Sequence, residues 1–192
     1  MKIGVLALQG DFVEHIAMLR RIGVETSEVR LPEQLDGLDG LIIPGGESTT
    51  IGKMAVDYHL IDPLRQFGSQ RAIWGTCAGA IFLSTDAHRQ QPLLGLMEII
   101  DERNAFGRQV ASFEIDLEIP ALQKVQPQGG PFHAVFIRAP LIESVSKRAQ
   151  VLAKVPDGRI VAAQQGHLLA TSFHPELTLD DRFHRYFVSL AK

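Results

Sequence analysis

The sequence predicts a single α/β domain whose central sheet is mostly parallel and flanked by helices, with antiparallel strands in the second half of the chain. Strand-like and helix-like segments alternate in the first half, which is typical of parallel strands joined by helical crossovers. Strand-like segments follow one another in the second half, with few helices between them. The 192 residues are 45% hydrophobic and 21% charged, which excludes a disordered chain, and no linker divides residues 1–192.

The first half is expected to contain four strands and three helices. The strands cover residues 2–8, 25–30, 39–43 and 71–75, and the helices begin near residues 11, 48 and 78. Asp11 is the expected cap of the first helix, with Glu14 as its capping-box partner, and Gly23 suits the helix end. Ser48 is the expected cap of the second helix, which runs to about Tyr58.

The second half is expected to form antiparallel strands followed by one helix. The strands cover residues 112–119, 133–138, 150–155, 159–164 and 167–173, and the helix begins near residue 180. Asp157-Gly158 and Gly166 are turn residues, which favours antiparallel pairing of the strands around them. Residues 123–131 (QKVQPQGGP) are expected to form a flexible surface loop.

The composition excludes several classes of protein. The net charge is −3, the pI is near 6.2 and no long basic run is present, so binding to nucleic acid is not expected. No apolar run approaches the roughly 18 residues of a membrane span, and no leader precedes the first strand, so we expect a cytoplasmic protein that does not bind membranes. A single cysteine, Cys77, excludes an intramolecular disulfide and a cysteine-rich zinc site, and no metal or cofactor is expected.

Cys77 lies in the strongest local motif, Gly75-Thr76-Cys77-Ala78-Gly79, which follows a strand and precedes a helix. This is the thiol version of the G-x-S-x-G nucleophile elbow, in which flanking glycines remove the Cβ clashes of a sharp turn. The helix that begins at Ala78 directs backbone amides toward the sulfur, which favours a thiolate. A buried structural cysteine is the alternative, and the glycines in their strand–helix context argue against it.

His174-Pro175-Glu176 follows the last strand and can supply the base that Cys77 needs. Pro175 favours an extended conformation for His174, and residues two apart in an extended segment point the same way. Glu176 can then reach the imidazole and fix its tautomer, as the acid of a triad does. A polar loop histidine beside an unrelated carboxylate is the alternative. The other histidines lack such a local partner and are expected at the surface or the core edge: His15, His59, His88, His133, His167 and His184.

A second candidate segment, Pro44-Gly45-Gly46-Glu47-Ser48, follows the strand that ends at Ile43. Open α/β sheets bind ligands at the carboxyl ends of their strands, and the two glycines let backbone amides approach a substrate oxygen. The amides of Gly46 and Ala78 could together form an oxyanion hole. A tight connecting loop is the alternative, and a P-loop is excluded because no G-K-[ST] follows.

Six motifs occur in order along the chain. They are Leu8-Gln9-Gly10, PGGESTT at 44–50, GTCAGAI at 75–81, ERNAFGRQ at 102–109, FIRAP at 136–140 and SFHPELT at 172–178. With them the chain resembles, over essentially its whole length, the class I (triad) glutamine amidotransferases. More narrowly, it resembles the glutaminase subunits of pyridoxal 5'-phosphate synthase, because a general triad amidotransferase would lack ERNAFGRQ and FIRAP.

The resemblance implies hydrolysis of L-glutamine to L-glutamate and ammonia. It implies that Cys77 is the nucleophile and that His174 and Glu176 complete the triad. It further implies a set of glutamine-binding residues: Gly46, Glu47, Ser48, Arg103, Ile137 and Arg138. The implied partner is a (β/α)8-barrel synthase subunit, in a large hetero-oligomer of up to twelve copies of each subunit, which receives the ammonia and makes pyridoxal 5'-phosphate. Docking of that partner is expected to reorganise the oxyanion-hole peptide.

Other functions stay open at this point. A glutaminase subunit could serve a different acceptor synthase. A peptidase or stress-response hydrolase could use the same elbow, and it would act on peptides without a partner. A regulatory module could keep the fold and bind glutamine without turnover, although such modules usually lose a member of the triad.

Overall fold

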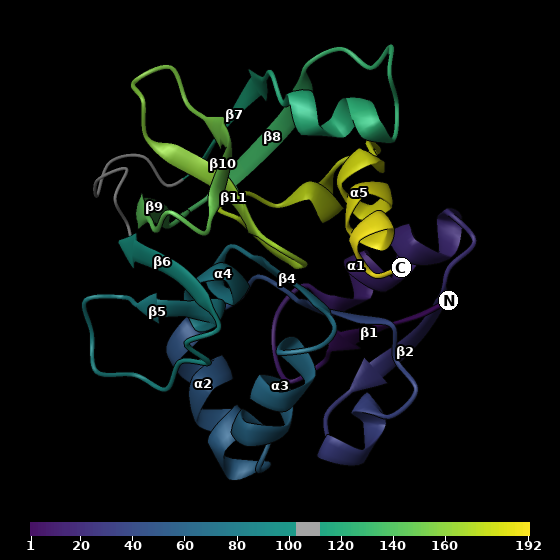
Figure 1. Ribbon diagram of the computed structural model, residues 1–192, viewed down its shortest axis with the longest axis vertical. Coiled ribbons are helices and arrows are strands. Elements are labelled where there is room, and N and C mark those ends of the chain that lie inside the picture. The colour runs from purple at the N-terminus through teal and green to yellow at the C-terminus, as the bar shows by residue number, and fades with distance from the viewer. Residues whose placement is uncertain (103–111) are drawn as a thin grey trace.

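The computed structural model describes residues 1–102 and 112–192, which form a ten-stranded sheet with helices packed against it (Figure 1). Strands from both halves of the chain share this sheet. Its main path runs in the spatial order β2 (Glu25–Val29), β1 (Lys2–Leu6), β3 (Gly40–Ile43), β4 (Ala72–Thr76), β12 (Leu168–Thr171), β11 (Ile160–Gln165), β9 (Leu141–Val145), β6 (Met97–Glu102) and β5 (Ser84–Asp86), and β10 (Gln150–Lys154) pairs with β11 beside this path.

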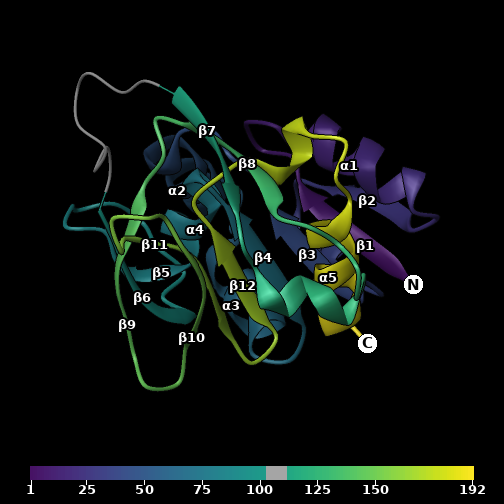
Figure 2. The ribbon, with the colours of Figure 1, turned by 90° about the horizontal axis from the view of Figure 1, so that it is seen from above.

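The strands from β2 to β12 pair in parallel, which confirms the predicted parallel centre. Beyond β12 the sheet continues through antiparallel pairs of β11, β9 and β6. Strand β12 is therefore the junction between the two parts, with β4 on one side and β11 on the other (Figure 2). Gly158 and Gly166, both with positive φ, lie in the turns of the antiparallel pairs β10–β11 and β11–β12, as predicted.

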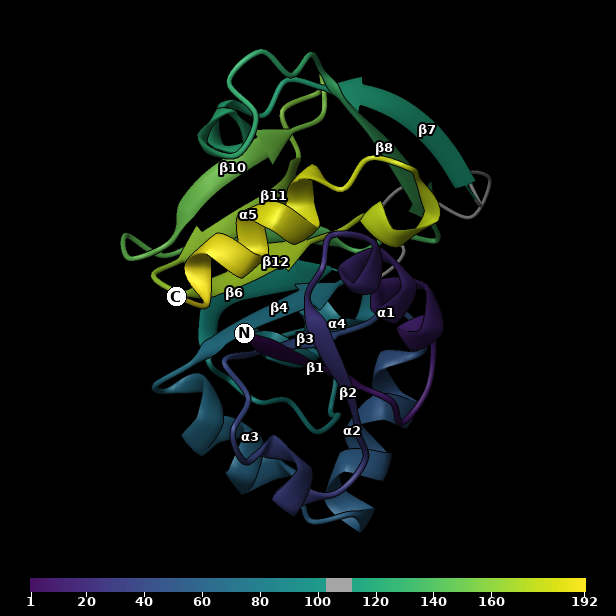
Figure 3. The same ribbon diagram turned by 90° about the vertical axis from the view of Figure 1, so that its right-hand side faces the viewer.

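Helices cover both faces of the sheet (Figure 3). The two helices on one face are α1 (Phe12–Arg21) and α5 (Arg182–Leu190), and those on the other are α2 (Ser48–Asp57), α3 (Ile61–Gly68) and α4 (Ala78–Leu83). Successive residues of a strand point to opposite faces, so Trp74 packs with α1 and α5 whereas Ile73 packs with α2, α3 and α4. Every residue of β4 is buried, as expected for a parallel strand covered on both sides.

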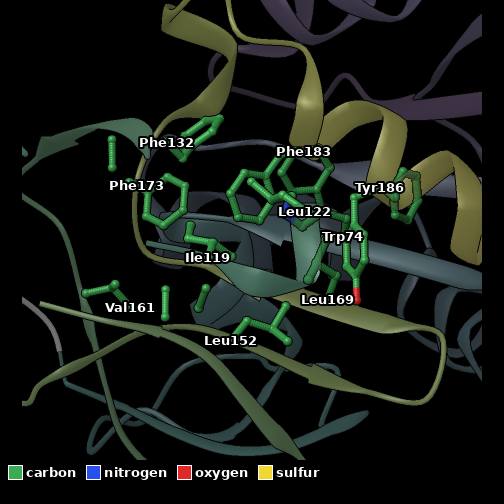
Figure 4. Packing of buried hydrophobic residues seen from close by; sticks show 14 of the residues in the cluster. Trp74, Ile119, Leu122, Phe132, Leu152, Val161, Leu169, Phe173, Phe183 and Tyr186 are labelled. Carbon is green, nitrogen blue, oxygen red and sulfur yellow. The ribbon is translucent and has the colours of Figure 1, made fainter. Parts of the chain in front are cut away.

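An aromatic cluster fills the core on the α1–α5 face (Figure 4). Phe183 of α5 contacts Trp74, Phe132 and Phe173, with ring centroids between 4.8 and 6.0 Å apart. Phe132 belongs to a second, two-stranded antiparallel sheet, formed by β7 (Ser112–Leu117) and β8 (Phe132–Ile137). This small sheet also contacts the site, because the backbone N–H of His174 donates to the Val135 carbonyl at 2.8 Å.

Four elements were not predicted: α3, β5, β6 and β9. Pro63 lies in the first turn of α3, where proline is tolerated because the first backbone N–H groups have no helical partner. The other three are short strands whose apolar residues do not alternate clearly with polar ones. The prediction of a flexible loop over 123–131 is wrong at both ends. Its start lies in the 3-10 helix Pro120–Lys124, and Arg182 donates to the carbonyls of Gly130 and Pro131.

The two predicted helix caps have different outcomes. Asp11 occupies the N-cap position of α1 as predicted, but its carboxylate makes no capping hydrogen bond and turns toward His174. Ser48 is the first residue of α2, and the cap is Glu47, which accepts from the backbone amides of Thr49 and Thr50. No helix in the described ranges is both long and apolar enough to cross a membrane.

Candidate active site

Three neighbouring parallel strands bring the candidate residues together. Ile43 of β3 pairs with Gly75 of β4, and Thr171 of β12 pairs with Thr76 of β4. The carboxyl ends of β3, β4 and β12 therefore meet at one edge of the sheet, where ligands bind in folds of this kind. The backbone N–H of Cys77 donates to the Thr171 carbonyl at 2.8 Å, which fixes the elbow against the strand that leads to His174.

Cys77 occupies the strained turn that the motif predicted. Its φ of 49° and ψ of −110° are rare for a residue with a side chain. A Cβ on Gly75 would lie 2.4 Å from the Gly79 carbonyl oxygen, and one on Gly79 would lie 2.0 Å from the Ile43 carbonyl oxygen. Only glycine fits at these two positions, so the motif carries the geometry of a nucleophile elbow.

His174 and Glu176 form the predicted pair. His174 Nδ1 lies 2.7 Å from Glu176 Oε1, and both side chains are buried. The backbone differs from the extended path that was predicted, because Pro175–Leu177 form a turn of 3-10 helix. His174 and Glu176 still contact each other, because the turn places both side chains on the same side of the chain.

The charge on the imidazole is set by several contacts. Burial alone would lower the pKa of His174, but hydrogen bonds with Asp11, Cys77 and Glu176 outweigh it and raise the pKa to about 12. The imidazole is thus protonated at neutral pH, within reach of the Cys77 sulfur on one side and a carboxylate on the other. Such an arrangement can stabilise a thiolate and later donate a proton.

Asp11, which was predicted to cap the first helix, is a second carboxylate at this imidazole. Its Oδ2 atom lies 3.4 Å from His174 Nδ1, and the hydrogen bond with His174 lowers the pKa of Asp11. Asp11, His174 and Glu176 offer ligand atoms within 4.8 Å of one another and could hold a metal ion. His174 Nδ1 already contacts Glu176 and Asp11, so the contacts fit proton transfer better than metal binding.

A cavity of about 490 Å³ opens in front of the sulfur, a size suited to a small molecule. Its lining includes eight residues singled out in the sequence: Gly46, Glu47, Ser48, Cys77, Ala78, Ile137, Arg138 and His174. Glu176 lies behind His174, outside that lining. Arg103, the remaining predicted residue, lies outside the described residues.

The loop before α2 is fixed by the side chain of Gln9, which belongs to the first of the six motifs but was given no role in the predicted site. The Glu47 backbone N–H donates to Gln9 Oε1 at 2.7 Å, and Gly45 accepts from the Asp11 backbone N–H at 3.2 Å. Gly46 has a φ of 152°, and a Cβ there would lie 2.4 Å from Gln9 Oε1. The glycine lets the loop pass close to Gln9 beside the cavity.

Two histidines contradict the expectation of a surface or core-edge position. His15 of α1 and His184 of α5 are fully buried, and their rings contact each other beneath the site. Contacts over this sequence distance depend on how the two helices pack, so no local pattern around either residue could reveal them.

Comparisons with known proteins agree with this geometry. The model of the SNO glutamine amidotransferase family matches residues 5–192. The chain is 56% identical to "Pyridoxal 5'-phosphate synthase subunit PdxT" of Herpetosiphon aurantiacus, over 99% of this chain and all of the relative. It is 55% identical to the protein of the same name from Dehalococcoides mccartyi, over 100% of this chain and 98% of the relative.

Solved structures show the same fold. A crystal structure of a glutamine amidotransferase superposes with a TM-score of 0.91 at 52% identity and covers 98% of both chains. The PurLQS structure from Thermotoga maritima superposes with a TM-score of 0.74 at 15% identity, covering 100% of this chain and 98% of that one, and shows the fold alone. From its sequence and its fold, the chain belongs to the SNO glutamine amidotransferase family.

Proposed function

We propose that this protein hydrolyses L-glutamine to L-glutamate and ammonia with Cys77, His174 and Glu176 as its triad. The observation that carries the proposal is the meeting of Cys77 with the His174–Glu176 pair at the carboxyl ends of β4 and β12, beside the cavity. Membership of the amidotransferase family supports the same reaction.

The reaction follows from the positions of these groups. The Cys77 sulfur attacks the side-chain amide carbon of glutamine, and the protonated His174 gives its proton to the nitrogen that leaves as ammonia. His174 then accepts a proton from water, which attacks the γ-glutamyl thioester and releases glutamate and the thiol. Glu176 keeps the imidazole oriented through Nδ1 and balances its positive charge.

Gly46 and Ala78 are the proposed oxyanion hole. Ala78 is the first residue of α4, where a backbone N–H has no partner within the helix. The Gly45–Gly46 peptide is held by the bond from the Asp11 N–H to the Gly45 carbonyl. Rotation of this peptide must break the hydrogen bond between Asp11 and Gly45. A docking partner would therefore act on this hydrogen bond.

The remaining lining residues are the proposed binding site for the amino acid part of glutamine. Arg138 can form charge-assisted hydrogen bonds to the substrate carboxylate, as Arg103 is proposed to do from the family motif. Glu47 offers the opposite charge to the ammonium group, with its carboxylate held in place by the amides of α2. Ser48 and Ile137 complete the wall of the cavity.

The acceptor of the ammonia is proposed from the relatives. They are named as subunits of pyridoxal 5'-phosphate synthase and match this chain over nearly their whole length. We therefore propose that the chain delivers ammonia to a (β/α)8-barrel synthase subunit, in a large hetero-oligomer in the cytoplasm, for the synthesis of pyridoxal 5'-phosphate.

The test is release of ammonia from L-glutamine, with and without the synthase subunit, by wild type, Cys77→Ala and His174→Asn. Wild type should be slow alone and faster in the complex, and both variants should lose at least about 10³-fold in kcat. His167→Asn is the matched control, since His167 contacts the Gly68 carbonyl away from the cavity. Ammonia release by Cys77→Ala in the complex would refute the triad, and partner-independent cleavage of peptides would favour a peptidase.

A further inference from the structure

A buried chain of polar groups continues from the triad into the core. His15 Nε2 lies 3.3 Å from Glu176 Oε2 and 3.2 Å from Thr76 Oγ1, and His15 Nδ1 lies 2.9 Å from His184 Nε2. His15 and His184 are fully buried, as is Thr76, the residue before Cys77. Burying a polar cluster of this kind costs free energy unless its groups form hydrogen bonds with one another.

Both histidines are neutral at the pH of the reaction. Burial lowers the pKa of His15 to about 4 and that of His184 to about 3. The charged groups that act on His15 are Glu176, His174 and Asp11, and Arg21 acts on His184. A neutral imidazole has one N–H, so each ring must donate through one nitrogen and accept through the other. The contact between His15 and Glu176 thus joins the dipole of a neutral imidazole to the charge of a carboxylate.

One arrangement of protons satisfies the described contacts. Glu176 Oε1 accepts from His174, whereas Oε2 is buried and has no hydrogen-bond partner in the described part of the chain. A carboxylate oxygen is stabilised by a nearby N–H and repelled by a lone pair, so the His15 proton belongs on Nε2.

The rest of the chain of contacts follows from that assignment. His15 Nδ1 then accepts from His184 Nε2–H, which leaves His184 Nδ1 without a proton. His184 Nδ1 has no hydrogen-bond partner within the described ranges. This agrees with the assignment, in which that nitrogen carries no proton to donate.

We propose that His15 is a positioning residue for catalysis: its Nε2–H is anchored on Thr76 Oγ1 at the start of the elbow, and from there its dipole stabilises the Glu176 carboxylate, whose Oε2 lies 3.3 Å away. This inference rests on the proposed function, because it assumes that Glu176 orients His174. Without the N–H, Oε2 is left buried beside no donor, so the carboxylate that orients the His174 imidazolium is less well stabilised. His15 is not among the residues that line the cavity, and its side chain meets the triad at Glu176, so its effect passes through Glu176.

The matched variants are His15→Gln and His15→Asn, measured in the complex with the synthase subunit. A glutamine amide nitrogen can replace Nε2 and keep the contact with Glu176, whereas the shorter asparagine amide replaces Nδ1 and reaches only His184. We expect His15→Asn to lose about tenfold in kcat with KM little changed, and the acid limb of its pH profile to move toward neutral pH. His15→Gln should stay within about threefold of wild type, with an unmoved acid limb.

Two further measurements keep the outcomes distinct. Urea unfolding shows whether both variants fold, and NMR of ¹⁵N-histidine-labelled wild type reads the tautomer of His15 without any substitution. An Nδ1–H tautomer at His15, equal losses in the two variants, or an unmoved acid limb in His15→Asn would overturn the inference. Activity of Cys77→Ala would instead overturn the proposed function, whatever the tautomer of His15.

Discussion

The cavity has two sides that are built in different ways. On one side, Cys77 and His174 are buried at the ends of central strands, with Glu176 behind them. On the other side, Ile137 and Arg138 are exposed at the end of β8, and Glu47 is half-buried in the loop before α2. The buried side is a set of groups that contact one another, whereas the second side presents Arg138 and Glu47 to the cavity, where a substrate could bind. We infer that the first determines the rate of the reaction and the second determines binding.

The largest expected effect comes from removing charge on the buried side. Glu176→Gln should lower kcat by about 10³-fold with little change in KM, because the imidazolium loses the nearer of its two carboxylate partners and the contact that orients the ring. Steady-state release of ammonia in the complex measures this. Glu114→Gln makes the same change at an exposed carboxylate 2.9 Å from His133 and should leave the kinetics unaltered. If Glu176→Gln and Glu114→Gln changed KM alike, the buried side of the cavity could not be said to determine the rate.

A smaller effect is expected on the exposed side. Arg138→Met should raise KM for glutamine by about 10 to 100-fold, the value of one or two charge-assisted hydrogen bonds, with kcat within a few fold of wild type. Arg148→Met is the control, since Arg148 pairs with Glu98 outside the cavity. If Arg138→Met reduced kcat and left KM alone, Arg138 would belong to the machinery of the reaction.

The smallest effect concerns stability in acid, which the buried histidines should control. Their pKa values are lower in the folded chain than the ordinary 6.5, so the unfolded chain binds more protons below pH 6.5 and stability falls as the pH drops toward 4. Each histidine should lower the free energy of unfolding by about 2 kcal/mol between pH 7 and pH 5. His184→Gln should recover about that amount of the loss, measured by urea unfolding at both pH values.

His133 provides the opposite case for this measurement. Hydrogen bonds to Asp116 and Glu114 raise the pKa of His133, so its contribution to stability is present at low pH and lost as the pH rises through the raised pKa. His133→Gln should therefore not lessen the loss in acid. Asp101, whose pKa burial raises to about 8, gives a slope of opposite sign in every variant and cancels in the comparison. An acid loss in His184→Gln equal to that of wild type would contradict the prediction.

Local steric rules made the central part of the site predictable. The glycines around Cys77 and the spacing of His174 and Glu176 each act within a few residues, and both predictions agree with the structure. The contacts of Asp11 with His174 and of His15 with Thr76 join residues far apart in sequence. Their partners depend on the order of strands in the sheet, which periodicity does not reveal.

The position of β12 has a consequence for how the protein is made. This strand inserts between β4 and β11, although nearly half of the chain separates it from the elbow that follows β4. During synthesis the thiol emerges from the ribosome long before its imidazole, and the sheet that unites them closes only when the final segments are complete. We therefore expect a chain that ends before His174 to release no ammonia from glutamine.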